Sequence, residues 1–177
     1  SKFGLIYAGA QKNMAPAGLT VVIVNKDLLG TPMPITPEIM DYNVLVKNDS
    51  MLNTPPCWCI YMLGLTLKWV EEEIGGVAQM ENLNTEKSNL LYSYLDQSRI
   101  FKPYAAKDSR SRMNITFRTG DDELDAAFID EAIKAGLHNV KAHRITGGMR
   151  ASLYNAMPLE GVKALVTFME KFEENHR

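Results

Sequence analysis

Cysteine is scarce in this chain of 177 residues, which contains only two. Cys57 and Cys59 are too close in sequence for an ordinary structural disulfide. A C-x-C pair without other cysteine or histidine residues beside it is also a poor zinc site. We therefore expect reduced thiols, no bound metal and a cytoplasmic protein.

Long apolar runs and an excess of charge of one sign are lacking as well. No run approaches the about 20 apolar residues that a helix needs to cross a bilayer. The 19 Lys and Arg residues nearly balance the 21 Asp and Glu residues, which gives a formal net charge of −2. Neither a membrane nor a nucleic acid is thus an expected partner. The 46% of hydrophobic and 23% of charged residues are typical of an ordinary globular protein.

The first third of the chain alternates short strand-like runs with loops. Residues 3–9 and 18–24 are rich in β-branched and aromatic side chains, and the turn-forming stretch AQKNMAPA separates them. Three prolines exclude regular structure from residues 30–37. Residues 42–56 are polar and irregular in pattern, so we expect a loop there.

Helical periodicity begins after this loop. Apolar residues recur in steps of three and four, which predicts an amphipathic helix over 56–74 that Gly75 and Gly76 end. The residues on its apolar face are Ile60, Leu63, Leu67, Val70 and Ile74. A second, longer helix is predicted over residues 77–97.

The remaining residues predict a compact α+β unit. Residues 113–118 alternate between apolar and polar side chains, as a half-buried strand does, and an acidic first turn and Gly136 bound a following helix. The stretches NVKAHR and MRASLY predict two strands around a double glycine, and Pro158 suits the first turn of a closing helix. From residue 57 the expected order is helix, helix, strand, helix, strand, strand, helix.

Lys12 lies between the two N-terminal strands, next to small residues. A lysine amine becomes a Schiff-base nucleophile only when burial or a nearby cation lowers its pKa. The small side chains of residues 8–10 would let a planar cofactor approach the backbone. Because most lysines at strand ends are simply solvated, two interpretations stay open: a turn residue or a nucleophilic amine.

Charged residues gather around the double glycine in AHRITGGMRASLYNAMP. Arg150, Ser152 and Tyr154 share one face of an alternating strand, and the residues between them are apolar. His143 and Arg144 precede the glycines. Two arginines and a histidine suit an anionic ligand, since guanidinium binds carboxylate or phosphate bidentately. A solvated strand face is an equally open interpretation.

Asn53 and Thr54 stand before two prolines at the start of the first predicted helix. One interpretation is that they cap this helix. The other is that the free N–H groups of its first turn support an anion.

Taken together, these segments resemble the phosphoserine aminotransferase family, which are class-V, fold-type I enzymes that use pyridoxal phosphate. The matching stretches, FGLIYAGAQKN, PAGLTVVIV, NTPP, MNITFR and GGMRASLYNAMPLEGV, follow the family's order across essentially the whole chain. The resemblance implies conversion of O-phospho-L-serine and 2-oxoglutarate to 3-phosphohydroxypyruvate and L-glutamate, in L-serine biosynthesis. It also implies an α/β fold: the end of the large cofactor-binding domain (1–56), connecting helices (57–97) and a small α+β C-terminal domain (98–177).

The resemblance implies roles in cofactor binding for four residues. Lys12 matches the lysine that binds the cofactor covalently and shuttles the proton of the substrate Cα. Gln11 matches a glutamine that contacts the cofactor phosphate. Asn53 and Thr54 match a pair that reaches the cofactor phosphate of the other subunit, which implies a homodimer with shared active sites.

Three further residues match groups that bind the substrate. Arg150 matches the arginine that holds the α-carboxylate, and His143 and Arg144 match the pair that binds the substrate phosphate or the glutamate side chain. Ala15 and Ala142 stand where family members commonly have glycine, which matters only if these positions need a positive φ.

Family members are substantially longer at the N-terminus. That part carries the aspartate that pairs with the ring nitrogen of the cofactor and the tryptophan that stacks on its ring, which neither Trp58 nor Trp69 matches. We therefore expect this chain to be inactive by itself. Two other hypotheses stay open: a non-catalytic C-terminal fragment or dimerisation domain, and a related fold-type I aminotransferase that acts on another amino acid.

Overall fold

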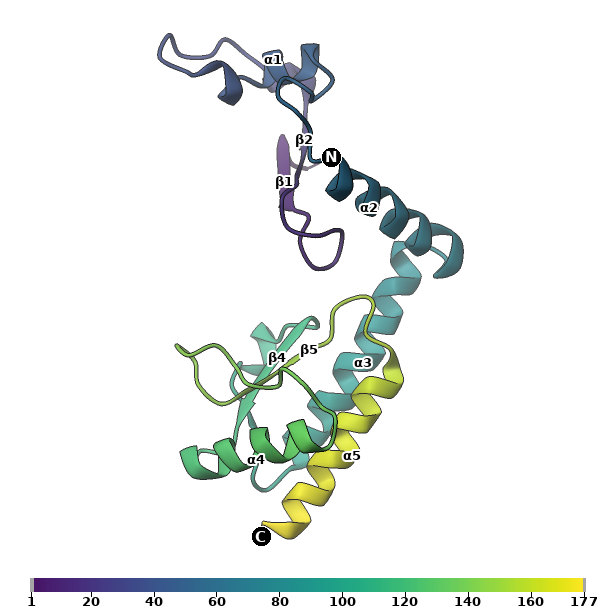
Figure 1. The fold of residues 1–177 in the computed structure, drawn as a ribbon, viewed down its shortest axis with the longest axis vertical. Coiled ribbons are helices and arrows are strands. Elements are labelled where there is room, and N and C mark those ends of the chain that lie inside the picture. Colours follow the sequence, from purple (N-terminus) through teal and green to yellow (C-terminus); the bar gives the residue numbers. More distant parts are fainter. Residues whose placement is uncertain (1, 177) are drawn as a thin grey trace. The chain divides into compact units, whose positions relative to one another are not determined.

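The computed structural model describes residues 2–176, which form two compact units (Figure 1). The first unit ends at Glu73 and the second begins at Ile74. The two predicted connecting helices fall on opposite sides of this boundary. The expected domain limits, 1–56, 57–97 and 98–177, stay a prediction.

A two-stranded antiparallel ribbon opens the first unit. β1 (Leu5–Gly9) pairs with β2 (Thr20–Val24), with Leu5 opposite Val24 and Gly9 opposite Thr20. This pairing confirms both predicted strands. Apolar side chains are exposed on both faces of the ribbon, since Tyr7 is 74% exposed on one face and Ile23 is 64% exposed on the other.

Short helical segments follow the ribbon. Residues 30–37 contain neither helix nor strand, as their prolines predict. The sequence interpretation of 42–56 as a loop is wrong in its first part, because α1 (Tyr42–Lys47) forms there. Asp41 caps α1 by accepting the N–H of Asn43 at 2.9 Å. The other short segments are η1 (Lys26–Leu28) and η2 (Glu38–Met40).

The first predicted helix forms as α2 (Cys57–Lys68), which continues as the π-helical segment η3 (Trp69–Glu73). Gly75 and Gly76 end it with φ values of 90° and 96°, which side chains with a Cβ rarely adopt. Cys59 is buried, and its thiol donates to the carbonyl oxygen of Ala17 (Sγ···O 3.4 Å). Both cysteines are free, as expected, and no helix within residues 2–176 is long and apolar enough to span a bilayer.

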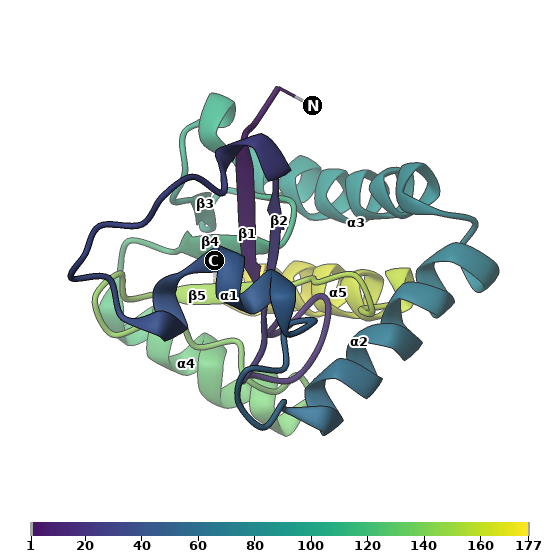
Figure 2. The same ribbon diagram turned by 90° about the horizontal axis from the view of Figure 1, so that it is seen from above.

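The second unit packs helices against a three-stranded antiparallel sheet with the strand order β3-β4-β5. Two long helices, α3 and α5, lie side by side in both ribbon views (Figures 1 and 2). The strands are β3 (Lys102–Pro103), β4 (Asn114–Arg118) and β5 (Met149–Ser152). The helices are α3 (Val77–Gln97), α4 (Asp122–Lys134) and α5 (Leu159–Asn175), with the short η4 (Lys107–Ser109) after β3.

Aromatic rings fill the core of the second unit. Phe101 is 0% exposed, and its ring centroid lies 5.8, 5.1 and 6.0 Å from those of Phe117, Phe128 and Phe172. On α5, apolar residues that recur in steps of one, three and four are all buried: Val162, Leu165, Val166, Met169 and Phe172. On α4, Phe128 and Ala132 are buried, whereas Ile133 is 48% exposed.

The sheet differs from its prediction in two ways. NVKAHR is not a strand: Lys141 makes only an isolated bridge to Met149, and the N–H groups of Thr146 and Gly147 both donate to the carbonyl oxygen of His143. The third strand is instead β3, whose two residues are too few to show a period. The observed order from residue 57 is therefore helix, helix, strand, strand, helix, strand, helix.

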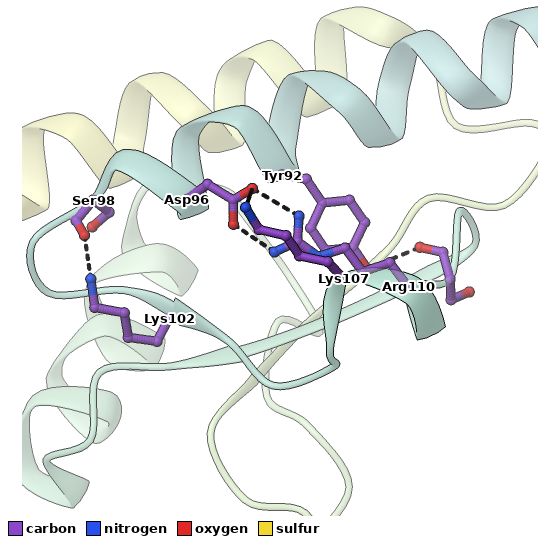
Figure 3. A network of polar contacts seen from close by, with 7 residues as sticks. Tyr92, Asp96, Ser98, Lys102, Lys107 and Arg110 are labelled. Atoms are coloured by element: carbon purple, nitrogen blue, oxygen red, sulfur yellow. Dashed lines mark hydrogen bonds and ion pairs between the residues drawn. The ribbon is translucent and has the colours of Figure 1, made fainter.

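A polar network ties the end of α3 to the segment before β4 (Figure 3). Arg110 donates to both carboxylate oxygens of Asp96, at 2.9 and 2.5 Å, and lies over the ring of Tyr92. The hydrogen bond from Arg110 holds the pKa of Asp96 below its ordinary value. Lys102 donates to the carbonyl oxygen of Ser98 at 2.6 Å.

Candidate active site

Lys12 lies on the tight turn that follows β1. Ala10, which is buried, fixes this turn: its N–H donates to the carbonyl oxygen of Leu19 at 2.8 Å. Its own carbonyl oxygen accepts the N–H groups of Met14 and Ala15, at 3.2 and 2.7 Å. The backbone is thus held on both sides of Lys12, and the lysine side chain is exposed.

The backbone of Lys12 is strained. Its φ is 83°, in the left-handed region that residues other than glycine, asparagine and aspartate rarely adopt. Such strain costs on the order of 1–3 kcal/mol, persists only where the surroundings impose it, and is concentrated at functional sites. A positive φ also occurs at Asp49, Ser50 and Asn139, so both interpretations of Lys12, a turn residue and a nucleophilic amine, are compatible with this backbone geometry.

The two alanines that replace family glycines are tolerated. Neither Ala15 nor Ala142 is among the residues with positive φ, so a methyl group strains neither backbone. Ala15 is buried inside the turn that carries Lys12. These departures therefore leave the turn intact.

The other residues matched to cofactor binding are exposed in the first unit. Gln11 precedes Lys12 and forms a bridge to Ala15 across the same turn. Asn53 and Thr54 lie in the loop before α2. The interpretation that either caps this helix is wrong, because Pro56 is the N-cap and no side-chain cap hydrogen bond is made there.

Arg150 lies in the middle of β5, opposite Thr116 of β4. Met149, Ala151 and Leu153 are buried, which confirms that Arg150 shares the opposite face of the strand. The Nε atom of Arg150 is buried and has no hydrogen-bond partner among the described residues. Buried donors are normally paired, but the Nε atom of Arg110 is unpaired in the same way beside its salt bridge to Asp96, so an unpaired Nε does not by itself mark a binding site.

His143 and Arg144 lie on the exposed turn that follows Lys141. Adjacent residues of a regular strand would point to opposite faces, and the turn removes that constraint. The N–H of Ile145 donates to Nδ1 of His143 at 3.3 Å, so the neutral ring carries its proton on Nε2.

The end of β4 holds this turn in place. Arg118 donates from Nη2 to the carbonyl oxygen of Thr146. Gly148 has a φ of 64°, and a Cβ atom there would lie 2.7 Å from the carbonyl oxygen of Phe117. Only glycine therefore fits where the turn meets the sheet.

Two cavities separate the substrate-binding candidates of the second unit. Arg150 lines a cavity of about 370 Å³, and the pair His143 and Arg144 lines another of about 340 Å³. The second cavity combines basic and acidic side chains: Lys141, His143 and Arg144 with Asp122, Asp125 and Asp130 of α4. Of these two cavities in the described residues, Arg150 lines one and the pair lines the other.

Lys87 is a buried lysine that was not among the functional residues predicted from the sequence. It is 3% exposed on α3, and its ammonium group donates to four backbone carbonyl oxygens. Burial lowers the pKa of Lys87. The signal was present, since Lys87 lies four residues after Leu83 and four before Leu91, on the apolar stripe of the helix.

The family described as Aminotransferase class-V matches residues 1–165. A phosphoserine aminotransferase from Bacillus circulans subsp. alkalophilus is 45% identical with a TM-score of 0.94, over 99% of this chain and 48% of its own. A phosphoserine aminotransferase with bound PLP from Trichomonas vaginalis is 42% identical with a TM-score of 0.87, over 94% of this chain and 48% of its own.

A more distant structure shares the fold alone. It is an alanine–glyoxylate aminotransferase from Nostoc sp., 18% identical with a TM-score of 0.71, over 95% of this chain and 47% of its own. In all three comparisons the chain spans about half of the other protein.

Proposed function

The chain belongs to the class-V aminotransferase family, and on that premise we propose that it forms the C-terminal part of a pyridoxal-phosphate-dependent phosphoserine transaminase of fold type I. The reaction converts O-phospho-L-serine and 2-oxoglutarate to 3-phosphohydroxypyruvate and L-glutamate, in L-serine biosynthesis. The observation that carries the proposal is Lys12, an exposed lysine held at a φ of 83°. It lies in a chain that is 42–45% identical to phosphoserine aminotransferases.

The residues present fit pyridoxal phosphate. An aldehyde requires a primary amine, which Lys12 presents from a fixed and exposed turn. A phosphate group requires N–H and O–H donors, which the exposed Gln11, Asn53 and Thr54 carry. When bound, the cofactor supplies an electron sink for the bond that breaks at the substrate Cα.

The chain's own residues would bind the substrate and move its proton. In this proposal the Nζ atom of Lys12 takes the proton from the substrate Cα and holds it for return. The guanidinium of Arg150 binds the α-carboxylate, which gives its buried Nε a partner. Orientation and proton transfer are therefore the contributions of these two residues.

His143 and Arg144 would recognise the phosphate of the substrate, or the side-chain carboxylate of glutamate. Three carboxylates make the cavity beside them unsuited to a dianion. Their exposed ring and guanidinium groups are thus the proposed contacts, rather than the cavity itself. Nε2 of His143 is free of the turn's own hydrogen bond through Nδ1 and is the donor that we assign to the phosphate.

We expect the double variant His143→Ala, Arg144→Ala to lose its preference for the phosphorylated substrate. The ratio of kcat/KM for O-phospho-L-serine to that for L-serine should fall about 100-fold or more, because two hydrogen bonds to a charged group are lost. The matched control is Lys163→Ala, an exposed cation on α5 that lines neither cavity. An unchanged ratio in the double variant would exclude phosphate recognition by this pair.

We further propose a cytoplasmic homodimer in which Asn53 and Thr54 reach the cofactor phosphate of the other subunit. We also propose that transaminase activity requires a further N-terminal portion in addition to these 177 residues, since the chain spans 48% of the phosphoserine aminotransferases that it resembles. The assays are therefore run on the chain alone and on the chain co-produced with the N-terminal half of the Bacillus protein. Activity of the chain alone would overturn this requirement, and inactivity of both forms would overturn the proposed function.

A further inference from the structure

The ammonium group of Lys87 binds the chain segment that follows β5. It donates to the carbonyl oxygens of Leu153, Tyr154, Asn155 and Met157, at 3.1, 2.8, 3.3 and 3.0 Å. An ammonium group has three N–H donors, so one hydrogen is shared between two of these oxygens. All four acceptors are backbone carbonyl groups, so Lys87 holds the backbone by hydrogen bonds and is not half of an ion pair.

A second contact reinforces the first. Asn84, almost one turn earlier on α3, donates from Nδ2 to Oδ1 of Asn155 at 2.8 Å, and both Asn84 and Lys87 are buried. Helix α3 therefore binds residues 153–157 through two side chains, Asn84 and Lys87. This segment joins β5 to α5 and contains no helix or strand of its own.

Segment 153–157, which Asn84 and Lys87 bind, begins three residues after Arg150. The N–H of Arg150 donates to the carbonyl oxygen of Val140 at 2.7 Å, and the N–H of Leu153 donates to that of Met113 at 2.8 Å. Leu153 and Met157, whose carbonyl groups Lys87 binds, also line the cavity of about 370 Å³ that Arg150 lines. The same few residues thus connect the ammonium group to the wall of the Arg150 cavity.

We propose that Lys87 is a positioning residue for Arg150: its buried ammonium group gathers the carbonyl groups of residues 153–157 and so fixes the strand that presents the guanidinium. The assignment of Arg150 as the carboxylate-binding group rests on the proposed function. The fastening of the segment by Lys87 does not.

The chemistry of the site requires a compact cation. Four carbonyl oxygens, one in a buried contact and three in part-buried ones, converge on this ammonium group. Without a donor they would repel one another and lose hydrogen bonds, which the backbone would avoid by moving. Methionine matches the length of lysine but supplies no donor. Arginine keeps the charge, but its planar fork does not match oxygens that converge on one point.

The test compares Lys87→Met with Lys102→Met by amide hydrogen exchange and NMR on the 177-residue chain. Lys102 is a matched control, because its ammonium group also binds a backbone carbonyl oxygen of the second unit (Figure 3). In Lys87→Met the amides of Leu153 and Met157 should exchange about tenfold to 100-fold faster, while those of α4 change less than about twofold. The Arg150 Nε–H resonance should shift or broaden in Lys87→Met alone.

Several outcomes would overturn the proposal. Unchanged exchange at residues 153–157 with an unmoved Arg150 resonance would exclude a positioning role. Equal acceleration throughout the second unit would mean that Lys87 contributes to global stability instead. If Lys87→Met does not fold, Asn84→Ala removes the second contact and should change the same signals in the same direction by less. Titration of the wild-type chain with 2-oxoglutarate tests the other hypothesis, that Arg150 binds a carboxylate. If the Arg150 resonance does not move, this result counts against the proposed function and not against the positioning role of Lys87.

Discussion

Replacement of Lys12 by alanine is expected to abolish covalent attachment of pyridoxal phosphate and to lower transaminase activity by about 10⁴-fold or more. The amine of Lys12 is assigned both the attachment of the cofactor and the transfer of the Cα proton. Its neighbours on the turn, Gln11 and Asn13, carry amides, which do neither. Both functions should therefore disappear together.

Attachment can be measured without turnover. The chain is incubated with pyridoxal phosphate, reduced with borohydride and digested, and the modified peptide is identified by mass spectrometry. We expect modification of the peptide that contains Lys12 and none there in Lys12→Ala. The matched control is Lys26→Ala, which removes another exposed lysine of the first unit and should leave the modification unchanged. Equal modification of many lysines, or full modification of Lys12→Ala, would contradict the assignment.

A third variant separates function from backbone strain. Lys12→Gly also removes the amine, but glycine adopts a φ of 83° without the penalty of about 1–2 kcal/mol that the left-handed region imposes on other residues. We expect this variant to lose attachment while the first unit becomes no less stable. Loss of attachment would then be a property of the amine and not a consequence of unfolding.

Replacement of Phe101 by alanine should lower the free energy of unfolding of the second unit by about 3–5 kcal/mol. Phe101 is fully buried and its ring contacts three other buried phenylalanines, so its removal leaves a cavity that rigid neighbours cannot fill. A loss of this size is a large part of the stability of a domain.

Urea unfolding followed by far-ultraviolet circular dichroism measures this effect. Both tryptophans, Trp58 and Trp69, lie in the first unit, so their fluorescence does not report on Phe101 directly. The control is Tyr104→Ala, because Tyr104 is 60% exposed and its ring centroid lies 5.5 Å from the guanidinium carbon of Arg118. It should cost about 1 kcal/mol or less. A similar loss in both variants would argue against a phenylalanine core.

Sequence periodicity predicts the long elements well. Helix α3 has the predicted bounds of 77–97, and the buried apolar residues of α5 are those that its apolar spacing indicates. The errors lie in short or locally determined segments. Six residues of α1 and two of β3 are too few to show a period. The stretch NVKAHR alternates as a strand does, but Lys141 makes only an isolated bridge to Met149 and the chain turns at His143, whose carbonyl oxygen accepts the N–H groups of Thr146 and Gly147.

The candidate site divides in the same way. The position of Lys12 between two strands and the face of Arg150 follow from the pattern of the sequence. The strain at Lys12 does not, because it arises from hydrogen bonds that converge on Ala10 in three dimensions. Lys87 stands on the apolar stripe of α3, yet its four ligands come from a segment about 70 residues away, at sequence separations of 66 to 70. Only folding brings a donor and its acceptors together over such a distance.

The ribbon of β1 and β2 has a consequence for the behaviour of the chain at high concentration. With two strands in this sheet, each has an outer edge whose N–H and C=O groups are a template for another extended chain. The stretch TVVIV contains no charge and no proline, and such stretches assemble readily into cross-β aggregates. The residues that oppose such aggregation, a charge or a proline, lie outside the two strands, at Lys12, Pro16 and Lys26. Self-association of this chain should therefore begin at β2, the strand that follows the turn of Lys12.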